Sequence, residues 1–151
     1  MRHQKTKRRK SKRMKPTICT TLGMIGSLIA GTFGGWDGAF ITLLIFMAVD
    51  YISGLAVALV FRKSPKTKSG GGSSSVGWKG LCRKGMTLLI VLVAYRLDLV
   101  LNTSYIRDTV IIGFIANETI SITENAGLMG VPLPKVIVKA IDILNDKEEK
   151  S

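Results

Sequence analysis

The chain has 151 residues, 46% of them hydrophobic, and a formal net charge of +12. That length suffices for one domain, and high hydrophobicity combined with high charge predicts apolar segments in lipid and charged segments in water. The one histidine and two separated cysteines match no metal or redox spacing, and the sequence has no catalytic set or phosphate loop, so we expect no enzyme, metal or cofactor. We predict an all-α, multi-pass transmembrane protein with three or four spans and a C-terminal amphipathic helix.

Residues 1–16 form a strongly basic arm, with nine Lys or Arg residues in 1–15. Seven more lie in 62–84 and only six elsewhere. Because such basic segments stay on the cytoplasmic side of a membrane, we expect a cytoplasmic N-terminus. A basic run can also bind nucleic acid, but beside a first span we favour a topology anchor that touches anionic lipid, and we expect no nucleic-acid partner.

The predicted transmembrane domain covers residues 17–127, and its first span covers 17–34. This span has no charged residue and would extend about 27 Å as a helix, close to the thickness of a bilayer core. Since further apolar segments follow, we expect an uncleaved helix and not a signal peptide. Residues 34–38 then predict a tight turn, with Trp36 anchored at the membrane interface.

Small residues follow two stripes of the first span at four-residue spacing. They are Gly23, Ser27, Gly31 and Gly35 on one stripe, and Gly26, Ala30 and Gly34 on the other. Small side chains let helix backbones approach closely in lipid. Packing within one chain and self-association between chains both fit this pattern.

Residues 39–61 form the strongest predicted span, with thirteen Leu, Ile, Val or Phe residues. Each contributes about −0.3 to −0.6 kcal/mol to insertion, against roughly +3 kcal/mol for Asp50 near the centre. An intramembrane carboxylate faces a partner or water, so Asp50 is either functional or held by a structural hydrogen bond. Gly54 continues its face and makes that face narrow enough for close helix contact.

A polar, cationic loop is predicted for residues 62–85, with the composition of a flexible linker at 69–75. A third span covers 86–101 and carries Arg96 and Asp98 near its far end. Because the loop is strongly basic, we expect it on the cytoplasmic side, which makes 34–38 an external turn.

Residues 105–125 are ambiguous, because the seven Leu, Ile, Val and Phe residues of 109–123 contribute only about −3 kcal/mol and Glu118 can cancel them. Either this segment is a fourth span whose polar side meets helices or water, or it packs at the surface. Its polar stripe comprises Gly113, Asn117, Ser121 and Asn125, with Glu118 and Glu124 nearby. The stripe would line water in an assembled pore, or it is the wet side of a surface helix.

The C-terminal segment, 128–151, contains an amphipathic stretch at 135–146 that is too short to span a bilayer. It should lie on the membrane surface or against another helix. With four basic and four acidic residues after Gly127, charge does not fix the side of the C-terminus.

Five segments, in order, resemble the toxin-secretion and phage-lysis holin family, which includes clostridial toxin-release holins. They are residues 34–37, 47–54, 74–80, 115–125 and 130–134, within a resemblance that covers about 34–144.

The resemblance implies a protein of the bacterial cytoplasmic membrane that oligomerises with itself into lesions. These lesions release an endolysin, or a toxin, without requiring direct contact with it. Two other interpretations stay open: a small transporter or channel subunit, and an antiholin that restrains a holin.

Overall fold

The structure, a computed structural model, describes residues 18 and 20–139, and every regular element within them is helical. The predicted all-α class is therefore confirmed, whereas the number of membrane spans stays a prediction. The basic arm 1–16 lies outside the described residues, as does most of the amphipathic stretch 135–146, of which 135–139 are helical. The chain forms two compact units, Met1–Trp36 and Asp37–Ser151.

The first unit contains the apolar helix Thr20–Phe33, which ends at two glycines. Gly34 has a φ of 83° and Gly35 a φ of 109°, values that favour residues without a Cβ. Gly35 N donates to Ala30 O over 2.7 Å, and Trp36 Nε1 donates to Gly26 O over 3.1 Å. The glycine turn predicted after the first apolar segment thus closes the helix.

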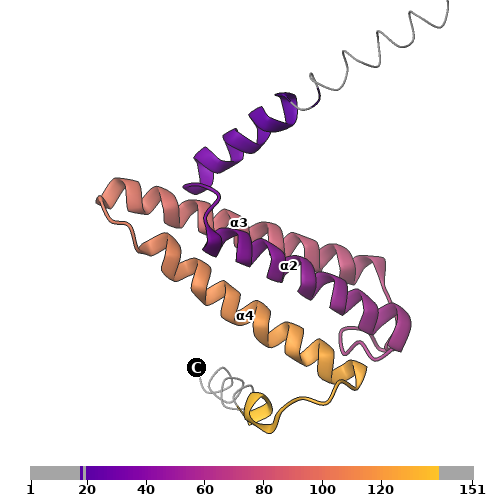
Figure 1. The fold of residues 1–151 in the computed structure, drawn as a ribbon. Helices are drawn as coiled ribbons and strands as arrows, with labels where there is room; N and C mark the ends of the chain where they lie inside the picture. The colour runs from indigo at the N-terminus through magenta and orange to yellow at the C-terminus, as the bar shows by residue number, and fades with distance from the viewer. Residues whose placement is uncertain (1–17, 19, 140–151) are drawn as a thin grey trace, which may run out of the picture. The chain divides into compact units, whose positions relative to one another are not determined.

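The second unit begins with helix α2, Gly38–Ala56, which continues into a π-helical turn, η1, Val57–Phe61 (Figure 1). Asp37 caps α2, because its side-chain carboxylate accepts a hydrogen bond from Phe40 N over 2.8 Å. Among the described residues, Gly38–Phe61 is the one helix long and apolar enough to cross a membrane by itself.

Helix α3 covers Ser74–Leu101, so the loop predicted for 62–85 is shorter, at 62–73. The polar composition of 74–85 concealed a helix whose glycines face α2: a Cβ on Gly77 or Gly80 would lie 3.7 or 3.9 Å from the Tyr51 side chain. The remaining loop is closed by backbone hydrogen bonds, among them Ser64 N to Gly70 O over 2.9 Å. Gly70 has a φ of 68° and an added Cβ would collide with Arg62 O.

Helix α4, Ile106–Met129, packs along both α2 and α3 and completes a three-helix arrangement (Figure 1). The core between the helices is formed by Phe40, Leu43, Met47, Val57, Val91, Ala94 and Ile111. Gly130, with a φ of 87°, ends α4, and the two prolines of 132–134 follow. Apart from its first residue, Tyr105, which is the N-cap, the ambiguous segment 105–125 is therefore part of one continuous 24-residue helix.

Candidate functional site

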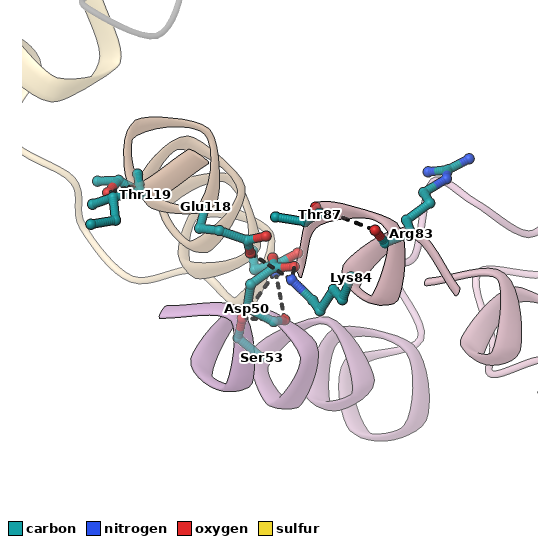
Figure 2. A network of polar contacts seen from close by, with 9 residues as sticks. Asp50, Ser53, Arg83, Lys84, Thr87, Glu118 and Thr119 are labelled. Atoms are coloured by element: carbon teal, nitrogen blue, oxygen red, sulfur yellow. Dashed lines mark hydrogen bonds and ion pairs between the residues drawn. The ribbon is translucent and has the colours of Figure 1, made fainter. Parts of the chain in front are cut away.

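Three helices of the second unit meet at a buried ionic cluster (Figure 2). Lys84 Nζ of α3 lies 2.9 Å from Asp50 Oδ2 of α2 and 2.5 Å from Glu118 Oε2 of α4. The side chains are 14%, 16% and 8% exposed, respectively. Two carboxylates share one ammonium group, so each charge loses most of its water and depends on its partners for stabilisation.

Amide and hydroxyl groups extend this cluster around Asp50. Asn125 Nδ2 donates to Asp50 Oδ1 over 3.0 Å and to Ser53 Oγ over 2.9 Å. The Ser121 side chain also hydrogen-bonds Asp50. A carboxylate in an apolar bundle therefore has a cation and neutral partners from two neighbouring helices, which offset the loss of its hydration.

Residue spacing places these groups on inward faces. Glu118, Ser121 and Asn125 follow steps of three and four along α4, and Lys84 precedes the buried Val91 of α3 by seven residues. Gly54 lets the helices approach, because a Cβ there would lie 3.7 Å from Asn125 Nδ2. Gly54 thus serves a close contact within the chain.

A second polar group lies where α3 ends and α4 begins. Asp98 Oδ1 accepts from Thr103 Oγ1 over 2.6 Å and from Ile106 N over 3.1 Å, and Asp98 Oδ2 accepts from Arg107 N over 2.9 Å. The carboxylate therefore caps α4 from the preceding helix, which fixes the turn between them.

Arg107 connects the start of α4 to the start of α2. Its Nη1 forms ion pairs with Asp37 and, over 3.0 Å, with Asp108, while its guanidinium lies 5.8 Å from the centre of the Phe40 ring. The hydrogen bond from Arg107 holds the pKa of the Asp37 carboxyl below its usual value, against the opposing effect of burial. The turns before α2 and before α4 consequently lie at the same end of the unit.

The structure separates the predicted polar stripe into two sets. Glu118, Ser121 and Asn125 join the buried cluster, whereas Asn117 and Glu124 are exposed on α4, as is Gly113. Gly113, Asn117, Ser121 and Asn125 therefore do not form one wet stripe, because four-residue steps drift around a helix of 3.6 residues per turn and turn Asn125 toward Asp50 and Ser53 of α2.

The other predicted site residues lie apart from the cluster. Arg96 is exposed on α3, and Trp36 is 46% exposed at the end of the first unit. A Cβ added at Gly23, Gly26 or Gly31 would meet nothing within 4 Å, so these glycines present an open face. Ser27 on the same helix is exposed and Ala30 is half-buried.

Sequence reasoning missed the basic partners of both polar groups. The sequence places Lys84 in a predicted cytoplasmic loop. However, Lys84, Val91 and Asp98 follow one another at intervals of seven residues, which puts them on one face of α3. The contact between Arg107 and Asp37 cannot be predicted from the sequence, since the two residues lie 70 positions apart and only the packed helices bring them together.

Comparison with known proteins identifies the family. Residues 27–146 match the model of the bacteriophage holin family. An uncharacterised protein of Clostridium perfringens is 39% identical over 86% of this chain and 93% of its own length. An uncharacterised protein of Listeria innocua is 37% identical over 88% and 94%, respectively.

A more distant relative carries a functional name. A protein of Bacillus phage phi105 named as a probable holin is 29% identical over 72% of this chain and 76% of its own length. No solved structure matches the chain. The family match covers well over half of the sequence, and the chain belongs to the bacteriophage holin family.

Proposed function

We propose that this chain is a holin that oligomerises in a bacterial cytoplasmic membrane and opens lesions through which an endolysin, or in some settings a toxin, leaves the cell. The observation that carries this proposal is the contrast between the outward faces of the three helices. Two of these faces are apolar, and the third is small and polar.

The apolar faces belong to α2, η1 and α3. Exposed large apolar residues on these elements include Ile41, Ile45, Val49, Ile52, Leu59, Val60, Met86, Leu89, Ile90, Val93, Leu97 and Val100. Side chains of this kind fit the hydrocarbon of a bilayer, where they favour insertion. We therefore orient α2 and α3 across the membrane with these faces toward lipid.

The outward face of α4 differs, because Ile112 is its one exposed large apolar residue. Its other exposed positions include Thr109, Gly113, Ala116, Asn117, Glu124 and Gly127. Polar residues within a membrane avoid lipid, and small ones allow helices to approach closely. This face suits a second copy of the chain or the water of a lesion, and the open glycine face of Thr20–Phe33 offers a further contact between copies.

The packing of α4 supports a four-span arrangement. Helices of 24 residues extend about 36 Å, enough to cross a hydrocarbon core of about 30 Å. Glu118 disfavours insertion of an isolated α4, but Lys84 pairs with it when α3 inserts alongside. With a cytoplasmic N-terminus, four spans return the C-terminus to the cytoplasm.

A topology measurement checks this arrangement. An enzyme active only in the cytoplasm should be active when fused after Lys66 or after Lys139, because both points then lie inside. Fused within 34–38 it should be silent, since this turn lies outside. Activity after Lys66 with silence after Lys139 would instead indicate three spans, and activity within 34–38 would reverse the orientation.

Induced expression in a bacterium tests the function itself. After a delay, we expect membrane potential to collapse abruptly, with growth arrest and release of a co-expressed endolysin into the periplasm or medium. An insertion-competent variant that fails to oligomerise provides the control. Continued growth with intact potential would contradict a holin and would favour a transporter subunit or an antiholin.

A further inference from the structure

One end of the three-helix unit has an exposed surface of cations. It comprises Arg62, Lys63, Lys66 and Lys68 of the loop and Lys79 and Arg83 of α3, and is called the cationic rim below. All six side chains belong to exposed residues, and none forms an ion pair with another described residue. Residues 51–97 contain no Asp or Glu, and the acidic residue just before this range, Asp50, interacts electrostatically with Lys66 of the rim.

The orientation of two adjacent residues of α3 distinguishes the rim from the buried cluster. Lys84 points inward between Asp50 and Glu118, whereas Arg83 points away from them (Figure 2). Arg83 therefore has its charge available at the surface. Internal partners account for Lys84, and Asp50 also interacts electrostatically with Lys66, whereas no acidic partner is found for Lys79 or Arg83 among the described residues.

An exposed tryptophan accompanies the rim. Trp78 precedes Lys79 on α3 and is 67% exposed, and Leu81 in the next turn is 47% exposed. Large exposed apolar groups beside cations are characteristic of surfaces at the boundary of a bilayer, where indole rings prefer to reside. Nucleic acid or an acidic protein would match the charge but would leave Leu81 without an apolar environment.

The length of α3 sets the depth of these residues. Its 28 residues extend about 42 Å, which exceeds a hydrocarbon core of about 30 Å by about 12 Å, or roughly eight residues. If the apolar C-terminal part, which reaches Leu101, fills the core, the excess begins at Ser74. Trp78 and Lys79 then lie at the level of the headgroups on the cytoplasmic side, and Arg83, about two residues inside the core boundary, reaches that level with its long side chain.

We infer that the cationic rim is a binding surface for the phosphate groups of anionic phospholipids, with Arg83 and Lys79 contacting the headgroups and Trp78 inserted between them. The inference rests on the proposed passage of α3 through the membrane. Guanidinium and ammonium groups bind phosphate through charge-assisted hydrogen bonds, and each cation near an anionic surface favours association. The rim would thus select its lipid neighbours as well as orient the protein.

Tryptophan quenching in vesicles tests this inference on the full chain. In a Trp36→Phe background, Trp78 is the only fluorophore of its kind, because the chain has two tryptophans. Phosphatidylglycerol brominated near the headgroup end of its acyl chains should quench Trp78 more strongly than identically brominated phosphatidylcholine. We expect Arg83→Gln to reduce this preference by up to about fivefold and Lys79→Gln/Arg83→Gln to reduce it further.

Arg96→Gln is the matched control, since it removes the same exposed residue type from the other end of α3. Its lipid preference should equal that of the parent, and high salt should weaken the preference of both, because both keep the cationic rim. Equal quenching by both lipids, or equal losses in Arg83→Gln and Arg96→Gln, would overturn the inference.

Three further outcomes separate this inference from the proposed function. Absence of quenching by either lipid would overturn it by showing that α3 does not place Trp78 in the membrane. Oligonucleotide binding that depends on Arg83, together with equal quenching by both lipids, would assign the rim to nucleic acid. If the parent shows no lipid preference, lipid selection by the rim is refuted. Abrupt lysis by Lys79→Gln/Arg83→Gln in that case would show that holin function does not depend on it.

Discussion

Replacing Lys84 with methionine should lower the free energy of unfolding of the three-helix unit by about 3–5 kcal/mol, the cost typical of removing one partner from a buried ion pair. The substitution leaves the carboxylates of Asp50 and Glu118 facing each other in a region where the side chains are 16% and 8% exposed. Asn125 still donates to Asp50 and Lys66 still acts on it electrostatically, but no other described cation forms an ion pair with either carboxylate.

The measurement is reversible unfolding in mixed detergent micelles, followed by helical circular dichroism. Arg83→Met is the matched control, because it removes an exposed cation from the adjacent position and should change the free energy of unfolding by no more than about 0.5 kcal/mol. Equal effects of Lys84→Met and Arg83→Met would contradict the assigned role of the cluster.

A triple variant separates charge from packing. In Asp50→Asn/Lys84→Met/Glu118→Leu the buried cluster carries no charge. Replacing a complete buried ionic group with uncharged residues often leaves stability unchanged or increases it. We expect most of the stability lost in Lys84→Met to return. If the triple variant is as unstable as the single one, the cluster contributes through shape and not through charge balance.

The strongest span could be predicted because composition alone decides it. Thirteen large apolar residues in 39–61 outweigh one carboxylate, and the structure places the helix at Gly38–Phe61. The requirement of Asp50 for a partner was also predictable, since an isolated charge in lipid is costly. The identity of that partner was not, because Lys84 and Glu118 are 34 positions apart and meet only when the helices pack.

Composition alone does not predict the start of α3 or decide whether α4 spans the membrane, and the two reasons are related. A cationic, Gly-containing and Ser-containing composition predicts a loop, yet Gly77 and Gly80 are the positions at which α3 approaches Tyr51. An insertion energy calculated for α4 alone includes the full free-energy cost of placing the unpaired Glu118 carboxylate in lipid. Lys84 pairs with that carboxylate in the folded unit, so the relevant segment is the pair of helices and not either one separately.

The separation of Asn117 from Glu118 leads to opposite expectations for the two residues. Glu118→Leu removes one of the two carboxylates that Lys84 contacts, and because Asp50 still pairs with the ammonium group, the unit should lose about 1–3 kcal/mol of stability. Asn117→Leu changes an exposed side chain and should alter the free energy of unfolding by about 0.5 kcal/mol or less, while it favours membrane insertion.

Despite that stability, Asn117→Leu should reduce crosslinked oligomers and delay or abolish lysis. On the small, polar face of α4 a leucine both removes an amide and holds neighbouring backbones apart. One hydrogen bond between membrane helices contributes about 0.6–2 kcal/mol, and the loss recurs at every contact of an assembly. A modest change per copy therefore has a large effect on a cooperative lesion.

Ala48→Leu provides the matched control, because it adds a leucine of the same size to an exposed position on the apolar side of α2. It should insert, oligomerise and lyse like the parent, since lipid accommodates the added side chain. The measurements are chemical crosslinking in membranes and the time from induction to loss of potential. If Asn117→Leu gives the parent's crosslinking pattern and lysis time, α4 does not form the contact between copies, and the open glycine face of Thr20–Phe33 becomes the surface to test in its place.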